Sequence, residues 1–295
     1  MEIGLMGTGL MGLPMAQRLL DASVPLIVYN RTVSKLKPLE DAGVAIAPLP
    51  EVLLRAASCV ILMLTDAEAI REVLFSEKCR PELAGKTVIQ MGTIAPDESR
   101  SLQAEIRAVG GDYLEAPVLG SISEAQAGKL LVMVGSTPEQ FDQWRDLLQN
   151  FGTEPIRVGD VGSAAALKLA LNQLISSLTA AFGTSLEFVL RQGVEVETFM
   201  KILRGSALYA PTFDKKLQRM VSGDYAKPNF PTKHLLKDTN LFIQAAEAID
   251  LDTSIPSAAQ QIVTRAIEMG LADADYSALF AALHQAPADA RPASD

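Results

Sequence analysis

The sequence predicts an α/β fold in which an N-terminal, doubly wound parallel sheet is followed by an all-helical C-terminal domain. Over the first 160 residues, short apolar runs alternate with helical patterns, and this alternation is typical of a mostly parallel sheet with crossover helices. After about residue 160 the strand patterns stop and helical patterns continue. We therefore expect two domains, residues 1–160 and 161–285, and a Pro/Ala/Asp-rich disordered tail at 286–295.

Apolar runs bounded by turn-forming residues predict eight strands, at 2–6, 25–29, 44–46, 59–64, 86–91, 112–118, 129–135 and 155–158. Helical spacing predicts crossover helices at 10–21, 33–41, 67–75, 96–108 and 138–150. Further helices are predicted at 161–191, 195–204, 210–221, 232–249, 256–270 and 276–284. The first of these is unusually long, and we expect it to bridge the two domains.

A glycine-rich turn connects the first strand to the first helix. It reads Gly7-Thr8-Gly9-Leu10-Met11-Gly12, which matches the dinucleotide-binding pattern Gly-x-Gly-x-x-Gly in its strand-to-helix context. In that pattern the first glycine permits the tight turn, the second lets a pyrophosphate approach, and the third allows close helix packing. The pattern predicts a Rossmann-type nucleotide site that includes Leu10 and Met11. The alternative is an ordinary turn with three glycines.

The end of the second strand indicates which nucleotide is bound. Asn30-Arg31-Thr32 stands where an NAD-binding fold usually carries an acidic residue for the ribose hydroxyl. The guanidinium of Arg31 suits a 2′-phosphate, and Lys35 offers a second cation nearby. The sequence therefore favours NADP(H) over NAD(H), against the alternative that both cations are solvated surface charges.

Composition limits the possible partners. A net charge of −9 argues against nucleic-acid binding, and the two cysteines fit a reduced, cytoplasmic protein. The uncharged segment from Leu169 to Leu186 is long enough to span a membrane, but its many polar residues favour a buried helix. We expect neither a membrane partner nor a metal site.

Small and hydroxyl-bearing residues follow three of the predicted strands. Leu64-Thr65, Thr93 and Leu119-Gly120-Ser121 stand at these strand ends, where α/β sheets bind their ligands. They predict a pocket that holds a small polar molecule against a nicotinamide. Each is also compatible with ordinary strand-to-helix turn chemistry.

Reduction of a carbonyl by hydride transfer requires a proton donor. Lys168 lies in an almost uncharged run, with Asn172 one helical turn later on the same face. Burial lowers the pKa of an ammonium group in general, so Lys168 is the candidate general acid. The alternative is a lysine that snorkels to solvent at a helix boundary. His284 lies next to the predicted tail, and His234 could be a surface residue.

Four motifs follow one another along the chain: the glycine-rich turn, the run from Glu115 to Gly128, the run from Gly162 to Asn172, and the pair Lys237-Asp238. In this order they resemble the motifs of the β-hydroxyacid dehydrogenase family, which includes 3-hydroxyisobutyrate dehydrogenase, tartronate semialdehyde reductase and glyoxylate/succinic semialdehyde reductase. The pair alone reads as solvated charges.

The resemblance implies a role for each motif. Lys168 would be the general acid/base, supported by Asn172, and the backbone at Gly120 and Ser121 would bind a substrate carboxylate, which such an anion nest can hold. Thr93 and Lys237 would contact the substrate and the nicotinamide. Asp238 would lie at the far side of the substrate pocket. The long helix resembles the one that forms the family's dimer, so a homo-oligomer, dimer or tetramer, is expected.

Departures from the family pattern bear on the substrate. The substrate motif commonly reads Ser-Gly-Gly, whereas here Leu119 removes a hydroxyl and Ser121 could restore one. Gly120-Ser121, Phe230-Pro231 and Arg31 together resemble the NADPH-dependent glyoxylate/succinic semialdehyde reductases, with Phe230 in the substrate pocket. The alternatives are a 3-hydroxyisobutyrate dehydrogenase, a tartronate semialdehyde reductase, or an inactive dehydrogenase-like oligomerisation domain.

Overall fold

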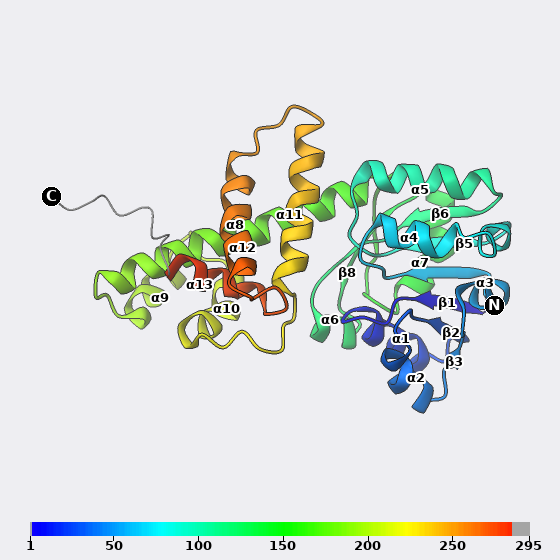
Figure 1. Ribbon diagram of the computed structural model, residues 1–295, viewed down its shortest axis with the longest axis horizontal. Helices are drawn as coiled ribbons and strands as arrows, with labels where there is room; N and C mark the ends of the chain where they lie inside the picture. The colour runs from blue at the N-terminus through cyan, green and yellow to red at the C-terminus, as the bar shows by residue number, and fades with distance from the viewer. Residues whose placement is uncertain (1, 285–295) are drawn as a thin grey trace. The chain divides into compact units, whose positions relative to one another are not determined.

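The computed structural model describes residues 2–284, and the predicted tail lies outside this range. The chain forms two compact units, of which the first ends at Leu169 and the second begins at Ala170. The first is built on a sheet and the second is helical (Figure 1). The predicted fold class is confirmed.

The first unit contains one sheet of nine strands, with the order β3-β2-β1-β4-β5-β6-β8-β7 and β9 paired with β8. The six strands from β3 to β6 are parallel, β6 and β7 are antiparallel to β8, and β9 is parallel to β8. The strands are β1 (Ile3–Met6), β2 (Leu26–Tyr29), β3 (Ala45–Ile46), β4 (Cys59–Leu62), β5 (Thr87–Gln90), β6 (Asp112–Glu115), β7 (Val118–Leu119), β8 (Leu131–Gly135) and β9 (Ile156–Gly159).

Helices cover both faces of this sheet because successive side chains of each strand point to opposite faces. In β4, Ile61 joins one buried apolar cluster, and Val60 and Leu62 join the other. The first cluster receives side chains from α1 (Gly12–Asp21), α2 (Lys37–Asp41) and α7 (Pro138–Leu148), and the second from α3 (Pro50–Ala56), α4 (Ala67–Leu74) and α5 (Pro96–Ala108).

Several predicted elements differ from those observed. The strand predicted over 112–118 is wrong as one element: it divides at Pro117, which lacks the N–H that a ladder needs, into β6 and β7. The helix predicted over 33–41 begins as the 3-10 turn η1 (Val33–Leu36) before α2. Three short elements were not predicted: α3, α6 (Ile122–Gln126) and the 3-10 turn η2 (Arg80–Leu83).

The second unit packs around two apolar clusters, one containing Phe182 and Phe213 and the other Leu235 and Val263. Helix α8 runs from Ser163 to Arg191 and contributes to both units of the chain. The remaining elements are α9 (Val196–Arg204), α10 (Pro211–Ser222), α11 (Thr232–Glu247), α12 (Ser254–Glu268), the 3-10 turn η3 (Tyr276–Ala278) and α13 (Leu279–His284).

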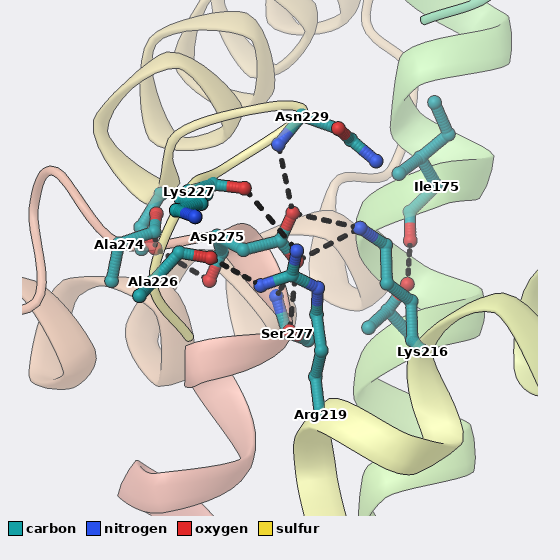
Figure 2. A network of polar contacts seen from close by, with 11 residues as sticks. Ile175, Lys216, Arg219, Ala226, Lys227, Asn229, Ala274, Asp275 and Ser277 are labelled. Carbon is teal, nitrogen blue, oxygen red and sulfur yellow. Dashed lines mark hydrogen bonds and ion pairs between the residues drawn. The ribbon is translucent and has the colours of Figure 1, made fainter. Parts of the chain in front are cut away.

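A buried ion pair joins α10 to the turn before η3 (Figure 2). Nζ of Lys216 lies 2.8 Å from both carboxylate oxygens of Asp275, and both side chains are less than a tenth exposed. Asp275 also accepts hydrogen bonds from the backbone of Asn229 and from Ser277. The carboxylate therefore fixes the loop that leads to Phe230 and α11.

Among residues 2–284, α8 is the one helix whose length and apolar content would suffice to span a membrane, a test that core helices also pass. It carries the buried polar side chains Asn172, Ser176 and Thr179. Asn172 is bonded to a side chain of α11, as expected for a helix packed within a protein.

Candidate active site

The glycine-rich turn joins β1 to α1 in the predicted manner. Gly7 has a φ of +99°, in the left-handed region that favours glycine. A Cβ on Gly12 would overlap the carbonyl oxygen of Gly7, whereas a Cβ on Gly9 would meet nothing within 4 Å. Helix α1 begins without a side-chain cap. Open space at Gly9 and an uncapped helix N-terminus fit a bound pyrophosphate.

The residue after β2, Asn30, is hydrogen-bonded to the glycine-rich turn. Asn30 accepts a 3.0 Å hydrogen bond from the backbone N–H of Thr8 and donates one of 2.8 Å to the carbonyl of Thr32. The Arg31 side chain is 86% exposed and lies 4.0 Å from Glu72, a weak surface pair. Lys35 lies on η1 and is also exposed. Both cations are therefore accessible beside the nucleotide turn.

The predicted strand-end residues lie past the carboxyl ends of neighbouring strands. Leu64 and Thr65 follow β4, and Thr93 follows β5, which pairs with β4 in parallel. Leu64 and Thr93 are half-buried, whereas Thr65 is exposed. Asp66 caps α4 by accepting a 2.8 Å hydrogen bond from the backbone N–H of Ala69.

The segment predicted to bind a substrate carboxylate already contacts a carboxylate of the chain. Glu124 accepts hydrogen bonds from the Ser121 backbone N–H, at 2.9 Å, and from the Ser121 and Ser123 hydroxyls. These bonds, first that of the Ser121 side chain and then that of its backbone, lower the pKa of Glu124 to about 2. Ser121-x-x-Glu124 matches the capping-box pattern, a signal that could have predicted this contact.

Another carboxylate holds the first turn of α8. Oε1 of Glu115, at the end of β6, accepts hydrogen bonds from the backbone N–H groups of Gly162, Ala164 and Ala165, at 2.8–3.1 Å. Lys168, one turn beyond Ala164, is 8% exposed. Glu115 begins the run that resembles the substrate motif, and no local pattern in the sequence indicates these bonds to α8.

The end of the run from Gly162 to Asn172 contacts the pair Lys237-Asp238 within the second unit. Asn172 donates a 2.6 Å hydrogen bond to Asp238 on α11, and Lys237 lies 2.9 Å from the other oxygen of that carboxylate. Phe230 stacks near His234, with ring centroids 6.4 Å apart. Burial, followed by the charge of Lys237, lowers the pKa of His234, so the ring favours its neutral form.

Both parts of the chain match known families. The family described as the NAD binding domain of 6-phosphogluconate dehydrogenase matches residues 2–161. The family described as NAD-binding of NADP-dependent 3-hydroxyisobutyrate dehydrogenase matches residues 162–283. The chain belongs to the β-hydroxyacid dehydrogenase family. It is therefore an oxidoreductase that uses a pyridine nucleotide.

Relatives in this dehydrogenase family align along nearly the whole chain. Glyoxylate/succinic semialdehyde reductase 2, chloroplastic, of Arabidopsis thaliana is 30% identical over 97% of this chain and 80% of its own length. Reductase 1 of the same plant is 30% identical over 96% of this chain and 98% of its own length. The solved structure of Psf3 in complex with NADP+ and 2-OPP superposes with a TM-score of 0.85, at 26% identity, covering 95% of this chain and 99% of Psf3.

Residues 2–284 contain no group of three or more His, Cys, Asp or Glu side chains that could hold a metal ion. Cys59 and Cys79 are buried and unlinked. The glycine turn, with open space at Gly9 and an uncapped helix N-terminus, is a geometry that fits a nucleotide.

Proposed function

We propose that this dehydrogenase reduces a small carboxylated aldehyde, of the glyoxylate or succinic semialdehyde type, with NADPH, and that Lys168 is the general acid. The observation that carries the proposal is the burial of Lys168 on α8. One helical turn later on the same helix, Asn172 is hydrogen-bonded to Asp238. A lysine that only snorkelled to solvent would not need this arrangement.

NADPH, when bound, supplies the hydride that adds to the carbonyl carbon. The ammonium group of Lys168 donates a proton to the carbonyl oxygen, so that the product is a neutral hydroxyl group rather than an alkoxide. Oδ1 of Asn172 is buried and has no hydrogen-bond partner among the described residues. Because an unpaired buried acceptor is costly, we assign it to the substrate hydroxyl or to the ammonium of Lys168.

The preference for NADPH is proposed from the end of β2. The position that usually holds an acid for the ribose is occupied by Asn30, and the Asn30 side chain is engaged with Thr8 and Thr32. The exposed guanidinium of Arg31 can then meet a 2′-phosphate, with Lys35 as a second cation. Psf3, whose fold is similar, was solved with NADP+.

The substrate class is proposed from the relatives and from the site. Two of the relatives are named for glyoxylate and succinic semialdehyde reduction, and both aldehydes carry a carboxylate. Gly120 and Ser121 would bind that carboxylate. Thr93, Lys237, Asp238 and Phe230 are the other positions that the family resemblance assigns to the substrate. Since Glu124 holds the Ser121 donors, it would have to release them when a substrate carboxylate arrives.

Initial rates test the substrate and the cofactor together. We would measure NADPH and NADH oxidation with glyoxylate, succinic semialdehyde, tartronate semialdehyde and methylmalonate semialdehyde. Fast NADPH-dependent turnover of the first two is expected. Turnover of methylmalonate semialdehyde with NADH would instead support a 3-hydroxyisobutyrate dehydrogenase, and turnover of tartronate semialdehyde would support a reductase of that compound.

The role of Lys168 is tested by Lys168→Ala. Loss of the general acid should lower kcat by about 10²- to 10⁴-fold, whereas Lys129→Ala, an exposed lysine of the same unit, should leave kcat unchanged. A Lys168→Ala variant that keeps most of its kcat would remove this residue from the mechanism. Absence of turnover with every aldehyde would support the inactive oligomerisation domain.

The homo-oligomer is also proposed. Helices α8 and α12 border a hollow of about 350 Å³ lined by small and apolar side chains, including Ala181 and Ile255, and Leu174 and Ile255 are exposed. A second copy of the chain would cover these side chains. Sedimentation velocity should give a dimer or tetramer for the parent chain and a smaller species for Ala181→Arg.

A further inference from the structure

The first turn of α8 receives a negative charge from a distant strand. No acidic residue lies in that turn, although a helix N-terminus favours negative charge. Glu115 supplies the negative charge, and one of its carboxylate oxygens accepts hydrogen bonds from three backbone N–H groups. The other oxygen is bonded to the hydroxyl of Ser99 on α5. Glu115 therefore connects β6, α5 and α8.

The surroundings of Glu115 leave its carboxylate little freedom to move. The residue is 1% exposed, and a Cβ added to Gly135 on β8 would overlap its Oε1. The Ser99 hydroxyl is held in turn by Tyr113, at 2.8 Å between the two oxygens. Burial raises the pKa of Glu115, against the lowering effect of its hydrogen bonds. Such a buried, bonded group fixes the helix end with high precision.

Lys168 follows this anchored turn directly. Ala164 and Lys168 are four residues apart in one helix, and Lys168, like Glu115, belongs to the first compact unit. A shift of the helix end would move Lys168 with it, and a 1 Å misplacement can cost about 10²-fold in rate. We propose that Glu115 is a positioning residue that sets the place of Lys168 by holding the first turn of α8; this rests on the general-acid role proposed above.

Two substitutions of Glu115 separate the negative charge of the carboxylate from its oxygen acceptor and its side-chain volume. Glu115→Gln keeps an oxygen acceptor for the three N–H groups, whereas Glu115→Ala removes it. Glu115→Ala should lower kcat by about 10- to 100-fold. It should change the Kd for NADPH by less than about threefold, because β4 and β5 lie in the sheet between β6 and β1, the strand that leads into the glycine turn. Glu115→Gln should recover most of the kcat. The matched control is Glu105→Gln, at a surface ion pair with Arg71.

The step through Lys168 is tested in the Lys168→Ala background. There the second substitution, Glu115→Ala, should cost little further activity, because the group that it positions is already absent. If Glu115→Ala lowers kcat in that background as much as it does in the parent, Glu115 acts on the fold in general and the proposal is overturned. A kcat within twofold of the parent for the single variant Glu115→Ala would also overturn it. Lys168→Ala alone decides the general-acid role, so the two failures are distinguishable.

Gly135→Ala provides a second route if Glu115→Ala does not fold. The added methyl group displaces the carboxylate without removing it, and kcat should fall in the same direction. An unchanged kcat for a folded Gly135→Ala variant, together with a Glu115→Gln variant no better than Glu115→Ala, would contradict positioning by the hydrogen bonds.

Discussion

Asn172 on α8 donates a 2.6 Å hydrogen bond from Nδ2 to Oδ2 of Asp238 on α11. The two residues are 66 positions apart in the chain, and both are at most 3% exposed. The bond joins two motifs that the sequence could only place separately. It also supplies the buried carboxylate with a partner beyond Lys237.

Removal of this donor should affect both stability and rate. Asn172→Ala leaves the carboxylate of Asp238 without its amide partner, a loss of about 1–3 kcal/mol in the free energy of unfolding. It also removes the acceptor assigned to the reacting groups, so kcat should fall. Urea unfolding and initial rates measure the two effects.

The matched control for Asn172→Ala is Asn240→Ala. Asn240 lies on α11, as does Asp238, and accepts a 2.7 Å hydrogen bond from the neutral amide of Gln260. Its replacement by alanine should cost less stability and should leave the activity unchanged. If the two variants behave alike, the Asn172–Asp238 bond has no special role.

Arg31→Ala tests the cofactor preference. Loss of the guanidinium should raise the KM for NADPH by about tenfold or more, because a charge-assisted bond to the 2′-phosphate is lost, and should leave the KM for NADH within about twofold. Arg55→Ala removes another exposed arginine of the same unit and should change neither value. Equal effects of Arg31→Ala on both cofactors would reject the proposed contact.

Glu124→Gln tests the carboxylate subsite. The ionised carboxylate, whose pKa lies at about 2, repels a substrate carboxylate throughout the working pH range, while glutamine keeps an oxygen for Ser121. The KM for glyoxylate should fall about three- to tenfold, with a smaller effect at high salt. The KM for an uncharged aldehyde should not change. A higher KM for glyoxylate would show that the charge of Glu124 orders the loop instead of competing.

The sequence predicts best where local patterns suffice. The alternation of apolar runs and helical periods is a local signal, so the parallel sheet and the second unit's helices could be read directly. Helix α6 has five residues, too few for a periodic signal, and the division at Pro117 depends on a proline whose effect varies with context. The three bonds from the start of α8 to Glu115 span 47–50 residues, and no spacing rule connects positions so distant.

Lys216→Met tests the buried ion pair of Figure 2. Asp275 would then be left as an uncompensated buried carboxylate, which costs about 3–5 kcal/mol of stability. Burial raises the pKa of Asp275, but the hydrogen bond and the charge of Lys216 outweigh burial and hold the pKa below its ordinary value. In Lys216→Met, the Asp275 carboxylate should therefore take up a proton more easily. Lys233→Met breaks an exposed pair with Asp273 and should cost less than about 1 kcal/mol. Similar losses in thermal unfolding for both variants would contradict the burial argument.

His234 predicts a pH dependence of stability. Its pKa is lowered in the fold, first by burial and then by Lys237, so the folded state favours the neutral ring. The contribution of His234 to stability is fully present above the pKa of histidine in the unfolded chain, about 6.5. It is lost as the pH falls below that value, because His234 binds a proton more readily in the unfolded chain than in the fold. His234→Gln should flatten the decline in Tm between about pH 6.5 and 5. An unchanged slope would assign the decline to carboxylates.

The boundary between the two compact units falls inside α8, after Leu169. A fragment that ended there would keep residues 163–169 of the helix, fewer than two turns, and isolated helices of that length are not stable in water. Lys168 would then lie at the end of a frayed helix, with the bonds from Glu115 to the first turn still in place. The chain therefore cannot be divided into independently folding parts at the boundary after Leu169. Chimeras that exchange one unit between relatives should keep the whole of α8 from a single parent.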